Sequence, residues 1–130
     1  MDSSNTVAAI IVDDNFTEQK SFEIAIGHCA LKVYGTGNPK EAIQLARELR
    51  PAFILTDLFL PALPAGLDFI ATLTEDPALK SIPVFAITLA TNETEETKAM
   101  QAGASGYLKK PVNREMLDML FGLSEQLRKS

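Results

Sequence analysis

The stretch Phe53-Ile54-Leu55-Thr56-Asp57-Leu58-Phe59-Leu60-Pro61 decides the fold of this chain, and Pro51 stands just before it. It is a mostly apolar run that carries one carboxylate, Asp57, and stops at a proline. A run of this length without polar alternation is typical of a strand buried on both faces inside a parallel sheet. Ligands bind at the carboxyl edge of such sheets, so Asp57 is predicted to be the reactive group.

Three other expected strands also lead into polar side chains. Residues 7–12 are apolar and run into Asp13 and Asp14, residues 83–88 end at Thr88, and residues 106–109 precede Lys110. Residues 30–34 form a short further strand, which the following glycines are expected to break.

Helices are expected between these strands, each with an apolar stripe or a recognisable cap. Phe22, Ala25 and Ile26 fall at helical spacing within residues 16–27. Asn38 caps a helix over residues 39–50, and Asn113 caps a last helix that reaches about residue 127. Two more helices are expected over residues 67–75 and 91–102. Strict alternation of strand and helix predicts an α/β domain whose parallel sheet has helices on both faces.

Composition narrows the class of protein. The 130 residues suit one domain over residues 1–130, with its core at about 7–127 and no output domain. No apolar run approaches the ~20 residues that cross a bilayer, and the N-terminus lacks a secretion signal, so a cytoplasmic protein without membrane contact is expected. Cys29 is the single cysteine, which excludes an internal disulfide. The net charge of -5 argues against direct nucleic-acid binding.

The polar strand ends form one constellation, because parallel strands bring their carboxyl ends to one edge. Clustered carboxylates repel one another unless a cation neutralises them, and an oxygen-only set suits Mg²⁺. A lysine amine and a threonine hydroxyl nearby would hold a phosphoryl group. The set therefore suggests a carboxylate that accepts phosphate, with Asp57 as the nucleophile.

These residues resemble the receiver domain of two-component response regulators, over about residues 7–127. The matching motifs are Val12-Asp13-Asp14, Asp57-Leu58-Phe59-Leu60-Pro61, Ile87-Thr88, Ala102-Gly103-Ala104 and Gly106-Tyr107-Leu108-Lys109-Lys110-Pro111. The length is similar to that of stand-alone chemotaxis-type receivers. The resemblance implies a flavodoxin-like, doubly wound, three-layer α/β/α fold with five parallel strands in the order 2-1-3-4-5 and five helices.

The resemblance also implies roles for single residues. Asp57 would be phosphorylated by a histidine kinase or phosphotransfer protein. Mg²⁺ or Mn²⁺ would be bound by Asp14, Asp57 and the backbone carbonyl of Phe59, and by Asp13 through a water. Thr88 and Lys110 would bind the phosphoryl oxygens, Tyr107 would be the switch aromatic, and the bond before Pro111 would be cis.

The same resemblance implies how the signal leaves the protein. The surface formed by the helix at residues 91–102, the strand at 106–109 and the last helix would contact a downstream protein target. The protein would be a monomer or weak homodimer. It would not be an enzyme, apart from promoting its own phosphorylation and dephosphorylation.

Two features depart from the family pattern. The loop at residues 61–66 is about one residue longer, and Leu89 replaces a small residue. Leu89 and Phe59 are predicted to shield the phosphoaspartate from water. One alternative is a pseudo-receiver that binds proteins without phosphorylation. A flavin carrier or an aspartate-nucleophile phosphatase fits less well, since the acids after the first strand repel phosphate and lack an Asp-x-Asp pattern.

Overall fold

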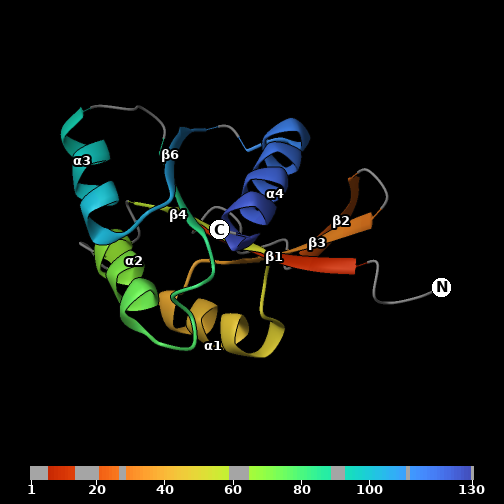
Figure 1. Ribbon diagram of the computed structural model, residues 1–130, viewed down its shortest axis with the longest axis horizontal. Coiled ribbons are helices and arrows are strands. Elements are labelled where there is room, and N and C mark those ends of the chain that lie inside the picture. Colours follow the sequence, from red (N-terminus) through yellow and green to blue (C-terminus); the bar gives the residue numbers. More distant parts are fainter. Residues whose placement is uncertain are drawn as a thin grey trace.

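The structure is a computed structural model that describes residues 6–13, 21–26, 29–58, 65–88, 93–110 and 112–129. Six strands and four helices form within these residues (Figure 1). In chain order they are β1 (Thr6–Val12), β2 (Ser21–Ile26), β3 (Cys29–Thr36), α1 (Pro39–Leu49), β4 (Phe53–Asp57), α2 (Ala65–Glu75), β5 (Val84–Thr88), α3 (Glu93–Ala102), β6 (Gly106–Lys109) and α4 (Arg114–Lys129).

The strands form one sheet in the order β2-β3-β1-β4-β5-β6. All neighbours from β3 to β6 pair in parallel, whereas β2 pairs with β3 in antiparallel fashion. The parallel part of the sheet follows the predicted strand order. The predicted totals of five strands and five helices are wrong for the described residues, because β2 occupies chain that was assigned to a helix.

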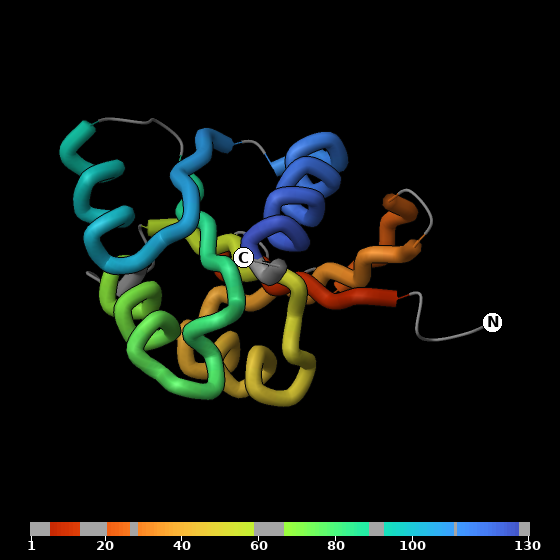
Figure 2. Tube along the Cα trace, viewed as in Figure 1, coloured from red at the N-terminus to blue at the C-terminus, as the bar shows by residue number. Residues whose placement is uncertain are grey.

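Helices cover both faces of the sheet, as expected, and give three layers. One core packs β1, β4 and β5 against α1, α2 and α3, with Ile10, Ile54 and Ile70 fully buried. The second core packs the other face against α4 through Leu117 and Leu120. Figure 1 shows α4 on the opposite side of the sheet from α1 and α2. The trace in Figure 2 places β2 and β3 at one end of the molecule and α3 at the other.

Residues 21–26 form β2, so the prediction of a helix over residues 16–27 is wrong there. Along β2 exposed side chains alternate with half-buried or buried ones, so that Ile24 is half-buried, Ala25 is exposed and Ile26 is buried. Opposite charges also pair across the strands, since Glu23 lies opposite Lys32 of β3. Isoleucine favours a strand. The spacing of Ile24 and Ile26 fits the two-residue period of a strand better than the helical spacing that suggested a helix. Residues 16–20 and 27 lie outside the described part.

Strand β3 is longer than predicted, because it runs through Gly35 and ends at Thr36. The predicted helix caps are confirmed. Asn38 accepts a hydrogen bond from the backbone N–H of Lys40 at 2.9 Å. Asn113 accepts one from Met116 at 2.9 Å and so starts α4.

Gly103 follows α3 with a φ of 117°. A Cβ at this position would lie 2.6 Å from Cγ2 of Thr74, so only glycine lets this turn approach α2.

Arg50 caps the C-terminus of α1 in the left-handed conformation, with φ 50° and ψ 62°. Among the described non-glycine residues it alone has a positive φ. Glycine is the common residue at such a cap, because a Cβ there clashes with the backbone. We expect Arg50→Gly to raise the free energy of unfolding by about 0.5–1 kcal/mol. Urea unfolding measures this, and a loss of stability would contradict it.

Candidate functional site

Four polar residues lie at the carboxyl edge of the sheet, as the sequence predicts. Asp57 is the last residue of β4 and Thr88 the last of β5. Asp13 directly follows β1, and Lys110 directly follows β6. Because these four strands run parallel, residues far apart in the sequence meet at one edge.

Lys110 joins the two carboxylates. Its ammonium nitrogen Nζ lies 2.7 Å from Oδ2 of Asp13 and 2.9 Å from Oδ2 of Asp57. The side chains are largely shielded from water, with exposures of 13% for Lys110, 6% for Asp13 and 10% for Asp57. The lysine reaches from β6 past the end of β5 to β4 and β1, so one cation links three strand ends.

The pKa of Lys110 is raised above its ordinary value of 10.5. Burial pulls this pKa down, but the hydrogen bonds and charges of Asp13 and Asp57 together outweigh burial. The amine is therefore a fixed positive charge at neutral pH, facing two carboxylates. A fixed cation beside a carboxylate can form charge-assisted hydrogen bonds with an anionic group such as a phosphoryl group.

Backbone hydrogen bonds hold the site residues in place. The N–H of Lys110 donates to the carbonyl of Thr88 at 2.7 Å, and the N–H of Asp13 donates to the carbonyl of Thr36 at 2.9 Å. The hydroxyl of Thr36 in turn donates to the carboxylate of Glu41 in the first turn of α1. Neither Thr36 nor Glu41 is predicted from the sequence to belong to the site. Their only signal in the sequence is a threonine between two glycines at the end of a strand.

Tyr107 lies on β6 with a half-buried side chain that packs against the core shared with α1, α2 and α3. Its hydroxyl is shielded from solvent and makes no hydrogen bond to any residue that the structure describes. A buried hydroxyl without a partner costs about 1–3 kcal/mol. In this position of the ring, the hydroxyl group of Tyr107 is therefore left without a hydrogen-bond partner among the described residues.

The side chains fit a hard divalent cation. Asp13 and Asp57 direct oxygen atoms at the same nitrogen of Lys110, so the two carboxylates already converge on one cation. Mg²⁺ takes one or two carboxylates and keeps several waters. Within the described residues no larger cluster of histidine, cysteine, aspartate or glutamate exists.

Several predicted site residues lie outside the described part of the chain. These are Asp14, Phe59, Leu89 and Pro111, together with residues 61–64 of the long loop. Their predicted roles stay predictions. His28 also lies outside, whereas Cys29 is half-buried at the start of β3.

No helix within the described residues is both long enough and apolar enough to span a bilayer.

Comparison with known proteins assigns the family. Residues 9–121 match the response regulator receiver domain. The polar-differentiation response regulator DivK of Brucella anthropi is 36% identical over 106 residues, which is 82% of this chain and 85% of DivK. Two solved structures share the fold over 92% of both chains: the phosphorylated cyanobacterial phytochrome response regulator RcpA, with a TM-score of 0.68 and 24% identity, and the Mn²⁺-bound response regulator Rcp1, with 0.60 and 20%. The chain therefore belongs to the response regulator receiver domains of two-component signalling.

Proposed function

We propose that Asp57 accepts a phosphoryl group from a phosphohistidine on a histidine kinase or phosphotransfer protein. The observation that carries this proposal is the convergence of Asp13, Asp57 and Lys110 at the carboxyl edge, beside Thr88. A carboxylate nucleophile held next to a fixed cation has the charge arrangement for phosphoryl transfer.

In the transfer step a carboxylate oxygen of Asp57 forms a bond to phosphorus. The bond between phosphorus and the histidine nitrogen breaks, and the imidazole keeps the electron pair. The product is an aspartyl phosphate on this chain and a free histidine on the donor. Lys110 then leaves its contact with Asp57 and binds a phosphoryl oxygen, while the hydroxyl of Thr88 donates to another.

Asp14, Asp57 and the backbone carbonyl of Phe59 would hold Mg²⁺ or Mn²⁺ directly, and Asp13 would contact the ion through a water. When bound, the ion supplies positive charge against the phosphoryl oxygens. The fold shared with the Mn²⁺-bound regulator Rcp1 and the phosphorylated regulator RcpA supports both parts of this proposal.

The output face is proposed to consist of α3, β6 and α4. Tyr107 lies on β6, and its unsatisfied hydroxyl gives a reason for the ring to adopt a second position when Thr88 binds phosphate. Large apolar side chains are exposed on the two helices. The exposed fraction is 45% for Met100 on α3 and 47% for Met119 on α4. Phosphorylation would bias two existing conformations, and a downstream protein would bind one of them.

The test is incubation with Mg²⁺ and acetyl phosphate, followed by intact mass measurement. We expect one phosphoryl adduct on the wild type and none on Asp57→Asn, which keeps the shape of the side chain but removes the nucleophile. Chelating the metal should also prevent the adduct. Asp118→Asn is a matched control, because this aspartate is exposed on α4. An unmodified wild-type protein would favour the pseudo-receiver.

Phe59 and Leu89 are expected to slow the loss of the phosphoryl group, since bulky apolar side chains beside an acyl phosphate exclude water. Phe59→Asn and Leu89→Ala should each shorten the lifetime of the phosphorylated protein several-fold. The decay of the adduct after removal of acetyl phosphate measures this. Unchanged lifetimes in both variants would refute the shielding role.

A further inference from the structure

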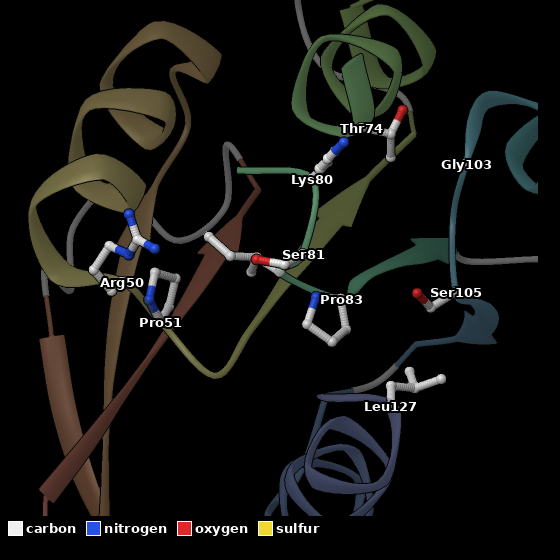
Figure 3. A pocket seen from close by; sticks show the side chains of 10 residues that line it. Arg50, Pro51, Thr74, Lys80, Ser81, Pro83, Gly103, Ser105 and Leu127 are labelled. Carbon is white, nitrogen blue, oxygen red and sulfur yellow. The ribbon is translucent and has the colours of Figure 1, made fainter. Parts of the chain in front are cut away.

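A cleft opens at the amino edge of the sheet, opposite the edge that carries Asp57. Its volume is about 650 Å³, within the roughly 300–1,000 Å³ of typical ligand pockets. It is formed where α1 and α2 end and where β4, β5 and β6 begin, with the end of α4 alongside. Figure 3 shows Arg50 on one side, Ser105 and Leu127 on the other, and Ser81 and Pro83 between them.

The charge of this cleft is opposite to that of the whole protein. Arg50 and Lys80 line it, and no aspartate or glutamate is among its lining residues, although the chain carries a net charge of -5. In the described part of the chain neither cation forms an ion pair, whereas Arg47 is paired with Asp76 at 2.5 Å. Two unneutralised cations in one cleft favour an anionic occupant.

Arg50 is placed in the cleft at a conformational cost. It occupies the left-handed cap of α1, where glycine would be free of strain. Strain of this kind at a residue that lines a cleft points to a role for its side chain. Arg50 also lines a neighbouring depression of about 270 Å³ that contains Lys32 of β3. Three cations therefore follow the amino edge in the order Lys32, Arg50, Lys80.

The walls of the cleft are held by hydrogen bonds of the backbone. The N–H of Ser105 donates to the carbonyl of Val84 at 2.6 Å, and the N–H of Ile82 donates to the carbonyl of Leu79 at 2.9 Å. The exposed hydroxyls of Ser81 and Ser105 add donors beside apolar surface from Pro83 and Leu127. The cleft thus offers charge, hydrogen bonds and an apolar wall without rearrangement of the chain.

We propose that this cleft binds an organic polyphosphate. Arg50 and Lys80 approach from different parts of the cleft, which suits a ligand with phosphate groups along its length (Figure 3). The guanidinium of Arg50 contacts two oxygens of one phosphate, and Lys80 acts as a point charge on another. The organic part packs on Pro83 and Leu127. This site is separate from Asp57 and does not depend on phosphorylation.

The first test is titration of the full chain with ATP, AMP and adenosine in the presence of EDTA. Binding should be tightest for ATP, weaker for AMP and absent for adenosine, because the phosphates of ATP reach both cations, the phosphate of AMP reaches one and adenosine has none. Amide signals of residues 80–82 and 103–105 should shift in NMR spectra. Shifts centred on Asp57, Thr88 and Lys110 would overturn the proposal, as would the absence of saturable binding by ATP.

The second test uses variants that separate binding from stability. Arg50→Gly and Lys80→Gln should each weaken ATP binding about tenfold or more. Arg50→Gly relieves backbone strain, so its weaker binding cannot be ascribed to unfolding. Lys98→Gln removes the same charge from the exposed face of α3 and should bind ATP as the wild type does.

Equal binding by Arg50→Gly and the wild type would overturn the assignment of the site. Equal weakening by Lys98→Gln would overturn it too, because only net charge would then matter. Tighter binding of a glutamate-rich peptide than of ATP would assign the cleft to a protein instead.

Discussion

Lys110→Met is expected to lower the free energy of unfolding by about 3 kcal/mol at neutral pH. The substitution keeps the length of the side chain and removes its charge. The carboxylates of Asp13 and Asp57, each nearly buried, would then face one another without the ammonium group that now contacts both. Removing one partner of a buried ion pair is costly, because the remaining charge is left without compensation. Urea unfolding at several pH values measures the loss.

The size of this loss should depend on pH in a defined way. The folded protein raises the pKa of Lys110 above 10.5, so the stability from its charge is complete below that value and disappears as the pH rises through the raised pKa. The difference between wild type and Lys110→Met should therefore persist through neutral and mildly alkaline pH.

Lys109→Met is the matched control, because the neighbouring lysine is exposed at the end of β6. It should change stability by no more than about 0.5 kcal/mol. Mg²⁺ should also restore stability to Lys110→Met more than it stabilises the wild type, since the ion replaces the missing positive charge. An equal loss in both lysine variants would show that Lys110 has no special role.

Phe53→Ala is expected to destabilise the protein by about 3–5 kcal/mol. Phe53 starts β4, is fully buried, and meets Phe85 of β5 in an edge-to-face contact with ring centroids 6.1 Å apart. Truncation leaves a cavity between the two strands that carry Asp57 and Thr88. Because Phe53 lies at the far end of β4 from Asp57, the protein that remains folded at low temperature should still accept phosphate from acetyl phosphate.

Met119→Ala is the control for Phe53→Ala, because Met119 is 47% exposed on α4. It should stay within about 0.5 kcal/mol of the wild type in urea unfolding. A loss of less than about 1 kcal/mol in Phe53→Ala would mean that the two strands repack, and the edge-to-face contact would then not explain the stability of β4.

Much of the site can be predicted from the sequence, because each site residue follows an apolar run. Asp13, Asp57, Thr88 and Lys110 are found at the edge where the strand order predicts them. Their contacts could not be predicted. The ion pair of Lys110 with Asp13 was not among the predictions. The predicted contact of Asp13 with a metal-bound water stays a prediction. The spacing of residues in the sequence places them at an edge, but it does not predict which lysine contacts which carboxylate.

The cleft at the amino edge could not be found from the sequence. Its two cations, Arg50 and Lys80, look like ordinary surface residues after helices, and Leu127 marks only the end of the last predicted helix. In the structure Leu127 is 46% exposed and lines the cleft. The cleft forms because three helices end at particular positions relative to the sheet. No local sequence pattern predicts those positions.

The sequence by itself determined the alternation of strands and helices from β3 onward, the helix caps at Asn38 and Asn113, and the polar edge around Asp57, because these features depend on neighbouring residues. Only the tertiary structure decided that residues 21–26 pair with β3 as an antiparallel strand. Their apolar residues suit a helix and a strand alike, and hydrogen bonds to β3 together with burial of Ile26 select the strand. The same long-range packing brought Lys110 to both carboxylates and left Arg50 and Lys80 in a cleft without acids.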